Sequence, residues 1–322
     1  MLFKTFKKMK VVFISSGNSK NGISAIVKRQ GETLQRAGIE VDFFKIKGKG
    51  FRGYFRNIFI FRTYLKNNPH NLVHAHYSLS AYVATLAGAK PLVVSLMGSD
   101  VYSKFYYKFL NKFLNKVFWN ACIVKSESMK NIAKIRKAIL IPNGIDINTC
   151  LLLTKNDARE KLGLDKAKKY ILFASDPARE EKNFSLLNTA IEQFNKTVEL
   201  LIVNDKSQEE LILYYNAVDV ILLTSLHEGS PNVVKEAMAC NCPVVSTDVG
   251  DVRWLFGDTP GYFITSFDYK DVVEKIKLAI NFREKYSQTK GRERIIDLGL
   301  DSGTVAGRII DVYRQVLKLT DH

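Results

Sequence analysis

The hydrophobic residues of this chain come in short continuous runs that alternate with stretches of helical periodicity. The first run, KVVFIS at 10–15, is followed by a polar loop and by the helical pattern ISAIVKRQGETLQRAG, which ends at Gly38. Continuous apolar strands that alternate with helices indicate parallel sheets covered by helices on both faces. We therefore predict an α/β fold with doubly wound parallel sheets. The further runs of strand length lie at 39–46, 71–76, 91–98, 121–126, 138–144, 169–175, 198–204, 218–225 and 242–248.

The length of the chain and the distribution of its charge both indicate two domains. At 322 residues the chain is longer than a single core usually supports. Residues 1–150 contain 25 Lys and Arg against 6 Asp and Glu, a net charge of +19, whereas residues 151–322 contain 23 against 26, a net charge of −3. One half is strongly basic and the other is nearly neutral. We therefore expect two domains with different partners, joined within 145–168.

Several classes of protein and site are disfavoured by what the sequence lacks. No apolar stretch approaches the roughly 18 residues that span a bilayer, and the basic amino end lacks the features of a signal peptide. The four cysteines, at 122, 150, 240 and 242, have no paired spacing beyond one Cys-Asn-Cys. We expect buried, reduced thiols in a cytoplasmic protein rather than disulfides or a metal site. Neither the G-x-G-x-x-G nor the P-loop phosphate motif is present.

The stretch HEGSPNVVKEAMAC, at 227–240, follows a predicted buried strand. Ser230 is a good N-cap and Pro231 a good first helical residue, so we predict that a helix begins there. The backbone amides of Asn232 and Val233 would then form an anion site at the carboxyl end of a parallel strand. Open α/β sheets bind their ligands at that edge.

Two glutamates flank this predicted anion site. Glu228 lies in the loop before the helix, and Glu236, after seven intervening residues, lies inside the helix and points back toward its amino end. A carboxylate on each side of a phosphate, each able to accept hydrogen bonds from hydroxyls, describes a nucleotide-sugar pocket. The alternative is that Glu236 is an exposed helix residue and Glu228 a turn residue.

Several segments of the chain together resemble glycosyltransferase family 4. HEGSPNVVKEAMACNCPVVSTDVGDV resembles the Glu–seven–Glu signature of the family, ILIPNGID its interdomain segment and DPAREEKN its diphosphate site. NGISAIVKRQGETLQRAGIEVDFF and LVHAHYSLSAYVATLAGAKPLVVSLMGSD resemble two further segments. The resemblance implies the GT-B fold, in which two Rossmann-like domains face each other across a cleft. It implies an acceptor-binding domain at 1–147, a nucleotide-sugar-binding domain at 148–304, and a last helix at 305–322 that packs back on the first domain.

The resemblance also implies roles for individual residues in a retaining, metal-independent glycosyltransferase of the hexosyltransferase type. Glu236 would bind the ribose hydroxyls of the donor, and Glu228 the hydroxyls of its sugar. Arg179 and Lys182 would neutralise the leaving diphosphate, so that Lys182, Arg179 and Glu228 would be catalytic. No cofactor or metal is expected, and the donor would be a UDP-, GDP- or ADP-linked sugar. The donor site would further include Gly22, Gly229, Ser230, Asn232 and Val233, and the acceptor side His76 and Asp100.

Two departures from the family pattern bear on these roles. Met97 stands where the family often has His before Gly-Ser-Asp, and ASDPAR replaces the common Gly-Arg run that leads to Arg179. The role of that His near the transferred sugar would be lost or would move to His76. A metal site stays an alternative for His74 and His76, which share one face of a strand, and a helix cap stays an alternative for Asp100.

Two predicted helices of the basic half are amphipathic. In 51–66, the 3-4 spacing unites Phe51, Tyr54, Ile58, Phe61 and Leu65 beside several arginines, and in 103–119 lysines recur at 104, 108, 112 and 116. Basic amphipathic helices with aromatic residues suit an anionic membrane surface, where each cation adds roughly 1 kcal/mol. The alternative is a solvated helix face over an ordinary core.

The expected function is transfer of a sugar from a nucleotide-diphosphate sugar to a lipid-linked or polysaccharide acceptor in cell-surface glycan synthesis. The protein would be peripheral on the inner, cytoplasmic face of the membrane. A nucleotide-sugar epimerase of the same fold is an alternative. A nucleic-acid-binding protein is disfavoured, because no recognisable RNA or DNA motif accompanies the positive charge.

Overall fold

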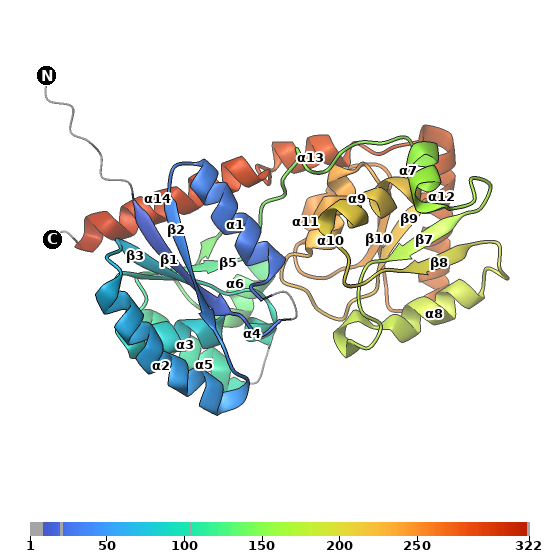
Figure 1. Ribbon diagram of the computed structural model, residues 1–322. Coiled ribbons are helices and arrows are strands. Elements are labelled where there is room, and N and C mark those ends of the chain that lie inside the picture. Colours follow the sequence, from blue (N-terminus) through green and yellow to red (C-terminus); the bar gives the residue numbers. More distant parts are fainter. Residues whose placement is uncertain (1–8, 20–21, 103–104, 321–322) are drawn as a thin grey trace, which may run out of the picture. The chain divides into compact units, whose positions relative to one another are not determined.

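The computed structural model describes residues 9–19, 22–102 and 105–320 (Figure 1). The chain divides into two compact units. Unit 1 runs up to Gly144 and resumes at Ser302, whereas unit 2 is Ile145–Asp301. The chain therefore passes twice between the units, and its last helix belongs to the first of them.

The sheet of unit 1 has six parallel strands in the order β2-β1-β3-β4-β5-β6. Its four inner strands are buried over nearly their whole length because both faces of the sheet are covered. The bounds are Lys10–Ser16 for β1, Glu40–Ile46 for β2, Leu72–His76 for β3, Leu92–Ser95 for β4, Ala121–Val124 for β5 and Ile139–Leu140 for β6.

Helices cover both faces of this sheet. One face carries α2 to α6, whose apolar side chains share a core with the strands. The other face carries α1 and α14, which share a second core with the same strands. The bounds are Ala25–Arg36 for α1, Gly50–Asn67 for α2, Ser78–Ala87 for α3, Ser99–Tyr102 for α4, Phe105–Val117 for α5, Glu127–Ala133 for α6 and Ser302–Thr320 for α14.

The sheet of unit 2 has five parallel strands in the order β11-β10-β9-β7-β8. Four of these strands correspond to predicted runs, and β11 was missed because its apolar run, YFI, is only three residues long. The prediction of two doubly wound parallel-sheet domains is confirmed. The bounds are Tyr170–Phe173 for β7, Glu199–Ile202 for β8, Val220–Leu223 for β9, Val244–Thr247 for β10 and Tyr262–Thr265 for β11.

The helices of unit 2 also lie on two faces. The helices α9, α10, α11 and α13 share one core with the strands, and α7 packs against α9. The helices α8 and α12 share the core of the opposite face. The bounds are Lys155–Leu162 for α7, Phe184–Glu192 for α8, Gln208–Ala217 for α9, Asn232–Ala239 for α10, Val252–Phe256 for α11, Tyr269–Tyr286 for α12 and Gly291–Asp297 for α13.

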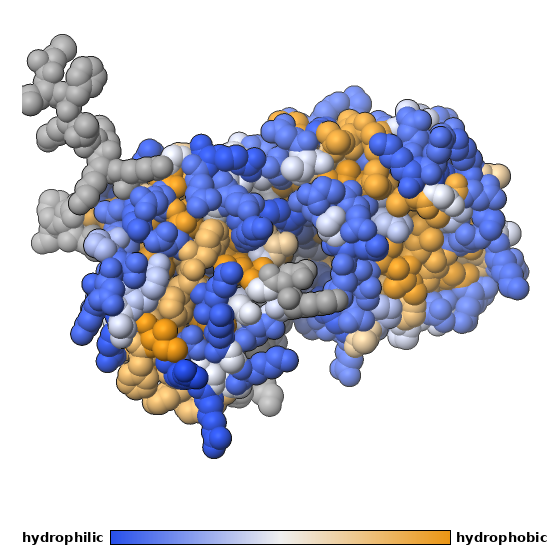
Figure 2. Space-filling model, viewed as in Figure 1, coloured by the Kyte–Doolittle hydropathy of each residue, from blue (hydrophilic) through white to orange (hydrophobic). Residues whose placement is uncertain are grey.

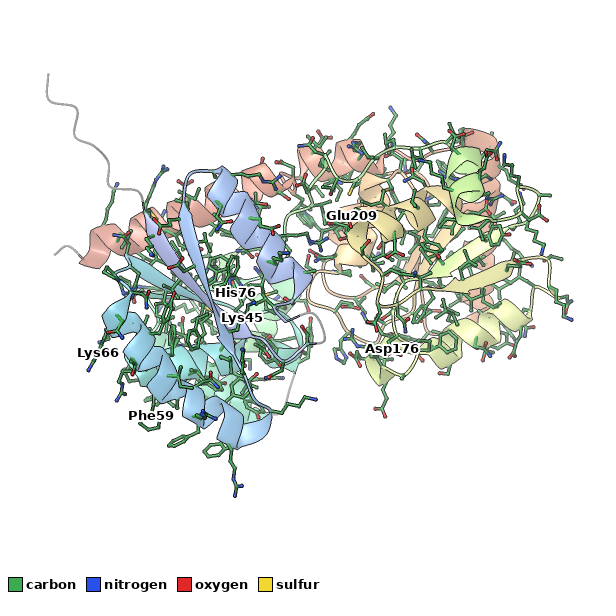
Figure 3. The ribbon with its side chains drawn as sticks, in the orientation of Figure 1. Lys45, Phe59, Lys66, His76, Asp176 and Glu209 are labelled. Carbon is green, nitrogen blue, oxygen red and sulfur yellow. The ribbon has the colours of Figure 1, made fainter. Side chains whose placement is uncertain are left out.

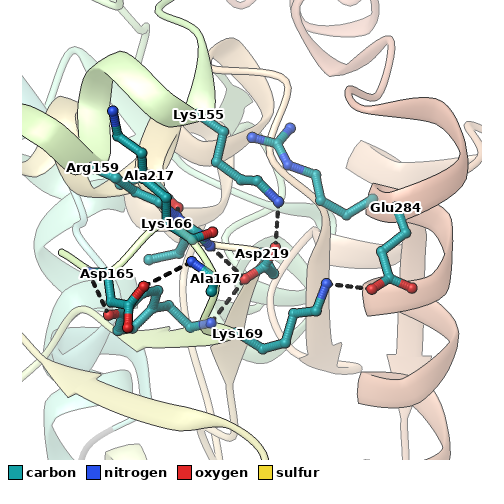
Figure 4. Close-up of polar contacts among 12 residues, drawn as sticks. Lys155, Arg159, Asp165, Lys166, Ala167, Lys169, Ala217, Asp219 and Glu284 are labelled. Carbon is teal, nitrogen blue, oxygen red and sulfur yellow. Dashed lines mark hydrogen bonds and ion pairs between the residues drawn. The ribbon is translucent and has the colours of Figure 1, made fainter.

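A buried ion cluster fixes the amino-terminal edge of the unit 2 sheet (Figure 4). The carboxylate of Asp219, just before β9, accepts bonds from Arg159 Nη2 at 2.8 Å, from Lys155 Nζ at 2.9 Å and from the amide of Tyr170 at 2.8 Å. Arg159 also donates to the carbonyls of Ala217 and Lys166. A buried charge is tolerated when its partners satisfy it in this way. This edge of the sheet therefore has a structural role, and we expect the ligand site at the opposite edge, where the strands have their carboxyl ends.

Candidate functional site

The strand order of unit 2 places a switch point between β7 and β9. Chain progression reverses there, because β8 lies on one side of β7 and β9, β10 and β11 lie on the other. Loops that leave the carboxyl ends of the two central strands diverge at such a point and leave a crevice for a ligand. The two loops in question are 174–183 and 224–231.

Hydrogen bonds join these two loops. Thr224 Oγ1 donates to the carbonyl oxygens of Lys182 and Asn183, at 2.9 and 3.1 Å. The amide of Leu226 donates to the carbonyl of Glu181 at 2.8 Å. The short 3-10 helix Glu180–Lys182 is thereby held against the end of β9.

This junction brings the predicted cation and the predicted carboxylate together. Lys182 Nζ forms an ion pair with Glu228 Oε1, and Ser225 Oγ donates to the same oxygen at 2.9 Å. Both side chains are largely shielded from water, which strengthens the attraction between them. In sequence the two residues are 46 positions apart. The pair therefore depends on the fold and presents a positive and a negative group at one point of the crevice.

Arg179 does not take part in this pair. Its guanidinium binds Glu181, two residues further along the same loop, with Nε 2.9 Å from Oε1. More than half of the Arg179 side chain is exposed. Of the two cations predicted for a diphosphate, the structure places Lys182 with Glu228 and leaves Arg179 on the outer side of the loop.

The start of α10 differs from the prediction by one residue. Pro231 is the N-cap, with φ −69° and ψ 115°, and the helix begins at Asn232. The predicted N-cap, Ser230, was wrong because its hydroxyl accepts a bond from Lys235 Nζ at 3.0 Å instead of capping the backbone. The amides of Asn232 and Val233 still lie in the first turn, so the expected anion site keeps its backbone donors. The side-chain oxygen of Asn232 is buried without a hydrogen-bond partner.

Gly229 lies in the loop before α10 and is covered by a second loop. A Cβ at Gly250, whose φ is +62°, would come within 2.8 Å of the Gly229 carbonyl oxygen. Only glycine combines that backbone conformation with so close an approach. Gly250 therefore fixes the position of the loop that carries Glu228.

The carboxylate of Glu236, on α10, is hydrogen-bonded to two side chains of α9. Its side chain is only 5% exposed, and its carboxylate accepts bonds from Tyr215 Oη at 3.1 Å and from Gln208 Nε2 at 3.3 Å. The alternative of an exposed helix residue is therefore wrong. Glu228 therefore bonds to a cation, whereas these two hydrogen-bond donors to Glu236 are neutral.

Sequence reasoning missed a buried pair beneath the site, Lys235 and Asp251. Lys235 is fully buried, and burial lowers its pKa to about 8 against the opposing effect of Asp251 and Glu236. Burial raises the pKa of Asp251 to about 6, although Lys235 opposes that shift. The available signal was a lysine inside the apolar run VVKEAMAC, where a charged side chain needs a partner. Through its bond to the Ser230 hydroxyl, Lys235 holds the chain where it enters α10.

Unit 1 has an equivalent switch point between β1 and β3. The loop after β1 contains Gly22, which has φ +80° and donates its amide to the Ser19 carbonyl at 2.9 Å. Residues 20 and 21 of this predicted glycine loop lie outside the described residues. His76 ends β3 at the same edge of the sheet, inside unit 1 (Figure 3).

His76 and His74 are stacked and buried. Their ring centroids are 4.3 Å apart, and the ring of His76 lies 4.4 Å from that of Phe13. His74 is bonded to Tyr313 Oη at 2.6 Å and to Ser95 Oγ at 2.8 Å, whereas neither ring nitrogen of His76 has a hydrogen-bond partner. Within the residues that the structure describes, no three metal-ligating side chains come together.

The side chain of Asp100 binds backbone amides of the loop around Met97. Its carboxylate accepts bonds from the amides of Met97 and Gly98, at 3.0 and 2.8 Å, and from the amide of Ser78 at 3.1 Å. It therefore ties the Met-Gly-Ser-Asp loop to the first residue of α3. Asp100 therefore acts as a helix cap, which was the alternative to an acceptor role. The helix that it caps is α3 and not the helix that follows it in the chain.

The buried His76 predicts a loss of stability in acid. Burial lowers the pKa of His76 to about 3, with a further contribution from Lys125. Below the ordinary histidine pKa of about 6.5, the unfolded chain binds a proton at His76 and the folded chain does not. The stability that is present above that pH is therefore lost as the pH falls. At pH 5 this proton should lower the free energy of unfolding by about 2 kcal/mol.

The substitution His76→Phe tests this assignment, because it keeps a ring between Phe13 and His74 but removes the proton. Urea unfolding at pH 7 and pH 5 should show a loss on acidification that is smaller by about 2 kcal/mol in the variant than in the parent. His70→Phe, at a partly exposed ring, is the matched control. Equal losses in parent and His76→Phe would show that His76 does not resist protonation.

Two family models match the chain, one in each half. The model for glycosyltransferase family 4 matches residues 43–149, and the model for glycosyl transferases group 1 matches residues 187–294.

Curated relatives include a protein of Bacillus subtilis (strain 168) named as a teichuronic acid biosynthesis glycosyltransferase. It is 29% identical over 217 residues, which cover 58% of this chain and 55% of that protein. A D-inositol 3-phosphate glycosyltransferase of Xylanimonas cellulosilytica is 26% identical over 56% of this chain and 51% of its own length. A capsular polysaccharide biosynthesis glycosyltransferase of Staphylococcus aureus is 32% identical over 28% and 24%. The chain spans about half the length of the first two relatives.

The fold matches solved structures over nearly the whole chain. Sucrose-phosphate synthase from Thermosynechococcus elongatus superimposes with a TM-score of 0.78 at 18% identity, over 97% of this chain and 100% of that one. An Anabaena protein solved in complex with UDP and glucose superimposes with a TM-score of 0.72 at 16% identity, over 95% and 100%. These likenesses show the fold, which is the GT-B fold.

Proposed function

Because the chain belongs to glycosyltransferase family 4, we propose that it transfers a sugar from a nucleotide-diphosphate sugar to an acceptor in cell-surface polysaccharide synthesis. The observation that carries this proposal is the Lys182–Glu228 pair at the β7/β9 switch point, with the buried Glu236 on the helix that follows. The names of the relatives from Bacillus and Staphylococcus support polysaccharide synthesis as the setting.

We propose that each part of the donor meets a group suited to it. The first amides of α10 and the ammonium of Lys182 would bind the diphosphate, because both present positive ends to an anion. Glu236 would accept bonds from the ribose hydroxyls, and Glu228 from a hydroxyl of the sugar. Gly229, Ser230, Asn232 and Val233 would line the path between them. Neighbours in fold solved with UDP and with ADP support a nucleotide-linked donor and leave UDP, GDP and ADP as candidates for its nucleotide.

In the proposed reaction the bond between the anomeric carbon and the phosphate oxygen breaks as a bond to the acceptor oxygen forms. The leaving diphosphate keeps the electron pair of the broken bond and receives the proton of the acceptor hydroxyl. Negative charge grows on the diphosphate in the transition state, where preorganised positive groups stabilise it most. We propose that Lys182 supplies the positive charge that stabilises the leaving diphosphate, and that no metal is needed. We also propose that the anomeric configuration is retained, as in the family that the sequence resembles.

We propose that the acceptor is lipid-linked and that the protein works on the inner face of the membrane. The support is the net charge of +19 in residues 1–150, which attracts the chain to anionic lipids. His76 and Asp100, at the carboxyl edge of the unit 1 sheet, would lie on the acceptor side. An epimerase of the same fold remains a second candidate, and it would change the donor with no acceptor present.

Thermal stabilisation by nucleotides tests the donor proposal without knowledge of the acceptor. A ligand that binds only the folded form and is present at ten times its Kd should add about 1.4 kcal/mol to stability, or a rise in Tm of about 2 °C for a chain of this length. We expect this rise with one of UDP, GDP and ADP, or with a sugar linked to it, and smaller rises with the other two. A flat response to the whole panel, nucleotide sugars included, would contradict the donor site.

A further inference from the structure

The long helix α2 has two apolar rows, and only one of them packs on the sheet. Ile58 and Phe61, two members of the row that the 3-4 spacing unites, are buried in the core of unit 1. For these two residues the alternative of a core-packed helix holds, because the 3-4 spacing selects a face without saying which way the face points. The row that faces outward consists of Phe51, Phe55 and Phe59, which are 83%, 50% and 56% exposed.

The three exposed phenylalanines form a ladder on the helix. They are spaced four residues apart, with ring centroids 5.8 Å apart between Phe51 and Phe55 and 5.5 Å apart between Phe55 and Phe59. Figure 3 shows Phe59 pointing away from the body of unit 1, and Figure 2 shows apolar side chains gathered along this edge. Contiguous exposed aromatic rings mark an interaction surface rather than ordinary scattered apolar residues.

Two more helices of the same layer expose apolar side chains. On α3, Leu86 is 58% exposed, and on α5, Phe109 and Phe113 are 69% and 50% exposed, again four residues apart. Hydrogen bonds join the layer, since Arg62 Nη2 of α2 donates to the Leu86 carbonyl of α3 at 2.7 Å, and Tyr82 Oη of α3 donates to Asn111 Oδ1 of α5 at 2.7 Å. We call the outward side of these helices the α2–α3–α5 surface.

The charges of the α2–α3–α5 surface have one sign. The sequences of the three helices contain no Asp or Glu. By contrast α1 and α14, on the opposite face of the sheet, include Glu32 and Asp311. Lys104, the first lysine of the stripe expected on α5, lies outside the described residues. The cations of the surface are Arg52, Arg56, Arg62 and Lys66 on α2 and Lys108, Lys112 and Lys116 on α5.

We propose that the α2–α3–α5 surface seats the chain on an anionic membrane, with the ladder of Phe51, Phe55 and Phe59 inserted at the level of the lipid headgroups. This inference rests on the proposed function and names the part that meets the membrane. The cations gain roughly 1 kcal/mol each near anionic lipid, and the rings add the burial of apolar area that makes attachment stable. In the described residues, no helix is long and apolar enough to cross a bilayer.

The position of the ladder connects it with the acceptor side. The helix α2 begins at Gly50, shortly after β2 ends at Ile46, so its amino end lies near the carboxyl edge of the sheet. His76 ends β3 at that same edge. Insertion of the ladder would therefore place this edge at the headgroups, where a lipid-linked acceptor presents its reactive end.

A membrane fits this surface better than a protein partner or a second copy of the chain. Two copies would bring two sets of cations together without a carboxylate on these helices to offset them. A surface that carries cations and no carboxylate attracts anions, and it suits contact with many lipid phosphates at once.

Vesicle sedimentation with the full chain tests the proposal. The parent should bind vesicles of equal parts phosphatidylcholine and phosphatidylglycerol, and bind vesicles of phosphatidylcholine alone far more weakly. Replacing all three rings by serine (Phe51→Ser, Phe55→Ser and Phe59→Ser) should lower binding to the anionic vesicles about tenfold. The matched control replaces three exposed leucines of unit 2 by serine (Leu151→Ser, Leu152→Ser and Leu278→Ser) and should bind as the parent does.

A second variant keeps the test independent of folding. Phe59→Trp should show a blue shift of its added fluorescence with anionic vesicles and none with neutral ones. Parent-like sedimentation of the triple serine variant, or an unshifted tryptophan at 59, would overturn the proposal. So would a parent dimer that the triple variant converts to a monomer, because the surface would then belong to a second copy. Nucleotide stabilisation of the triple variant, which should equal that of the parent, separates failure of this inference from failure of the donor proposal.

Discussion

Replacing Lys182 by methionine should lower the turnover number of glycosyl transfer roughly 100- to 1000-fold and change the affinity for the nucleotide sugar much less. The ammonium pairs with Glu228 in this structure and would face the diphosphate in the donor complex. Charge on the diphosphate increases as the glycosidic bond breaks, so Lys182 would stabilise the transition state more than the ground state. Steady-state kinetics with a saturating donor, together with direct measurement of donor binding, separates the two effects.

Three control variants make this result specific. Lys277→Met removes an exposed lysine of α12 and should leave turnover unchanged. Ser225→Ala removes the hydroxyl partner of Glu228 but keeps its cation, so it reports how much of the effect comes from a disturbed Glu228. Arg179→Met should cost far less than Lys182→Met, because Arg179 binds Glu181 on the exposed side of the loop. An unchanged turnover in Lys182→Met would remove Lys182 from catalysis.

The fold was predictable from the sequence because its strands are buried on both faces. Such strands appear in the sequence as continuous apolar runs, and the run at 218–225 is an example that contains β9. The strand at Tyr262–Thr265 was missed because its apolar run is only three residues long, whereas β8, at the other edge of the sheet, includes part of the longer run LLIV. The start of α10 was misplaced by one residue because a buried lysine, which cannot be identified from spacing, takes the Ser230 hydroxyl.

The candidate site was predictable where its residues lie close together in sequence. The Glu–seven–Glu stretch gave Glu228 and Glu236 directly, but the ion pair of Glu228 with Lys182 became visible only once β7 and β9 were neighbours. The buried Lys235 and Asp251 were missed for the same reason, since Lys235 lies on α10 and Asp251 is the N-cap of α11. The two rows of α2 have the same periodicity, so only packing decides that Phe61 is inside and Phe55 outside. The acceptor roles of His76 and Asp100 stay predictions.

Replacing Glu236 by alanine should weaken the binding of nucleotide and nucleotide sugar about 100-fold. A buried carboxylate that accepts bonds from the two ribose hydroxyls contributes roughly 1.5–3 kcal/mol to binding for each charge-assisted bond. The net contribution is smaller, because in the unbound protein Glu236 already accepts bonds from Tyr215 and Gln208. Binding of UDP by isothermal titration calorimetry measures the loss. The unbound variant should unfold at nearly the parental temperature, because these two known partners can bond to water in the enlarged crevice.

A double cycle with a deoxynucleotide assigns this loss to the ribose. The parent should bind 2′-deoxy-UDP about tenfold more weakly than UDP, since one bond to Glu236 is missing, whereas Glu236→Ala should bind the two nucleotides equally. Glu209→Ala, an exposed glutamate one residue from Gln208 (Figure 3), and Tyr215→Phe, which keeps the carboxylate, should both distinguish the two nucleotides as the parent does. If Glu236→Ala also distinguishes them tenfold, Glu236 does not touch the ribose, and its burial beneath α9 is a feature of the core.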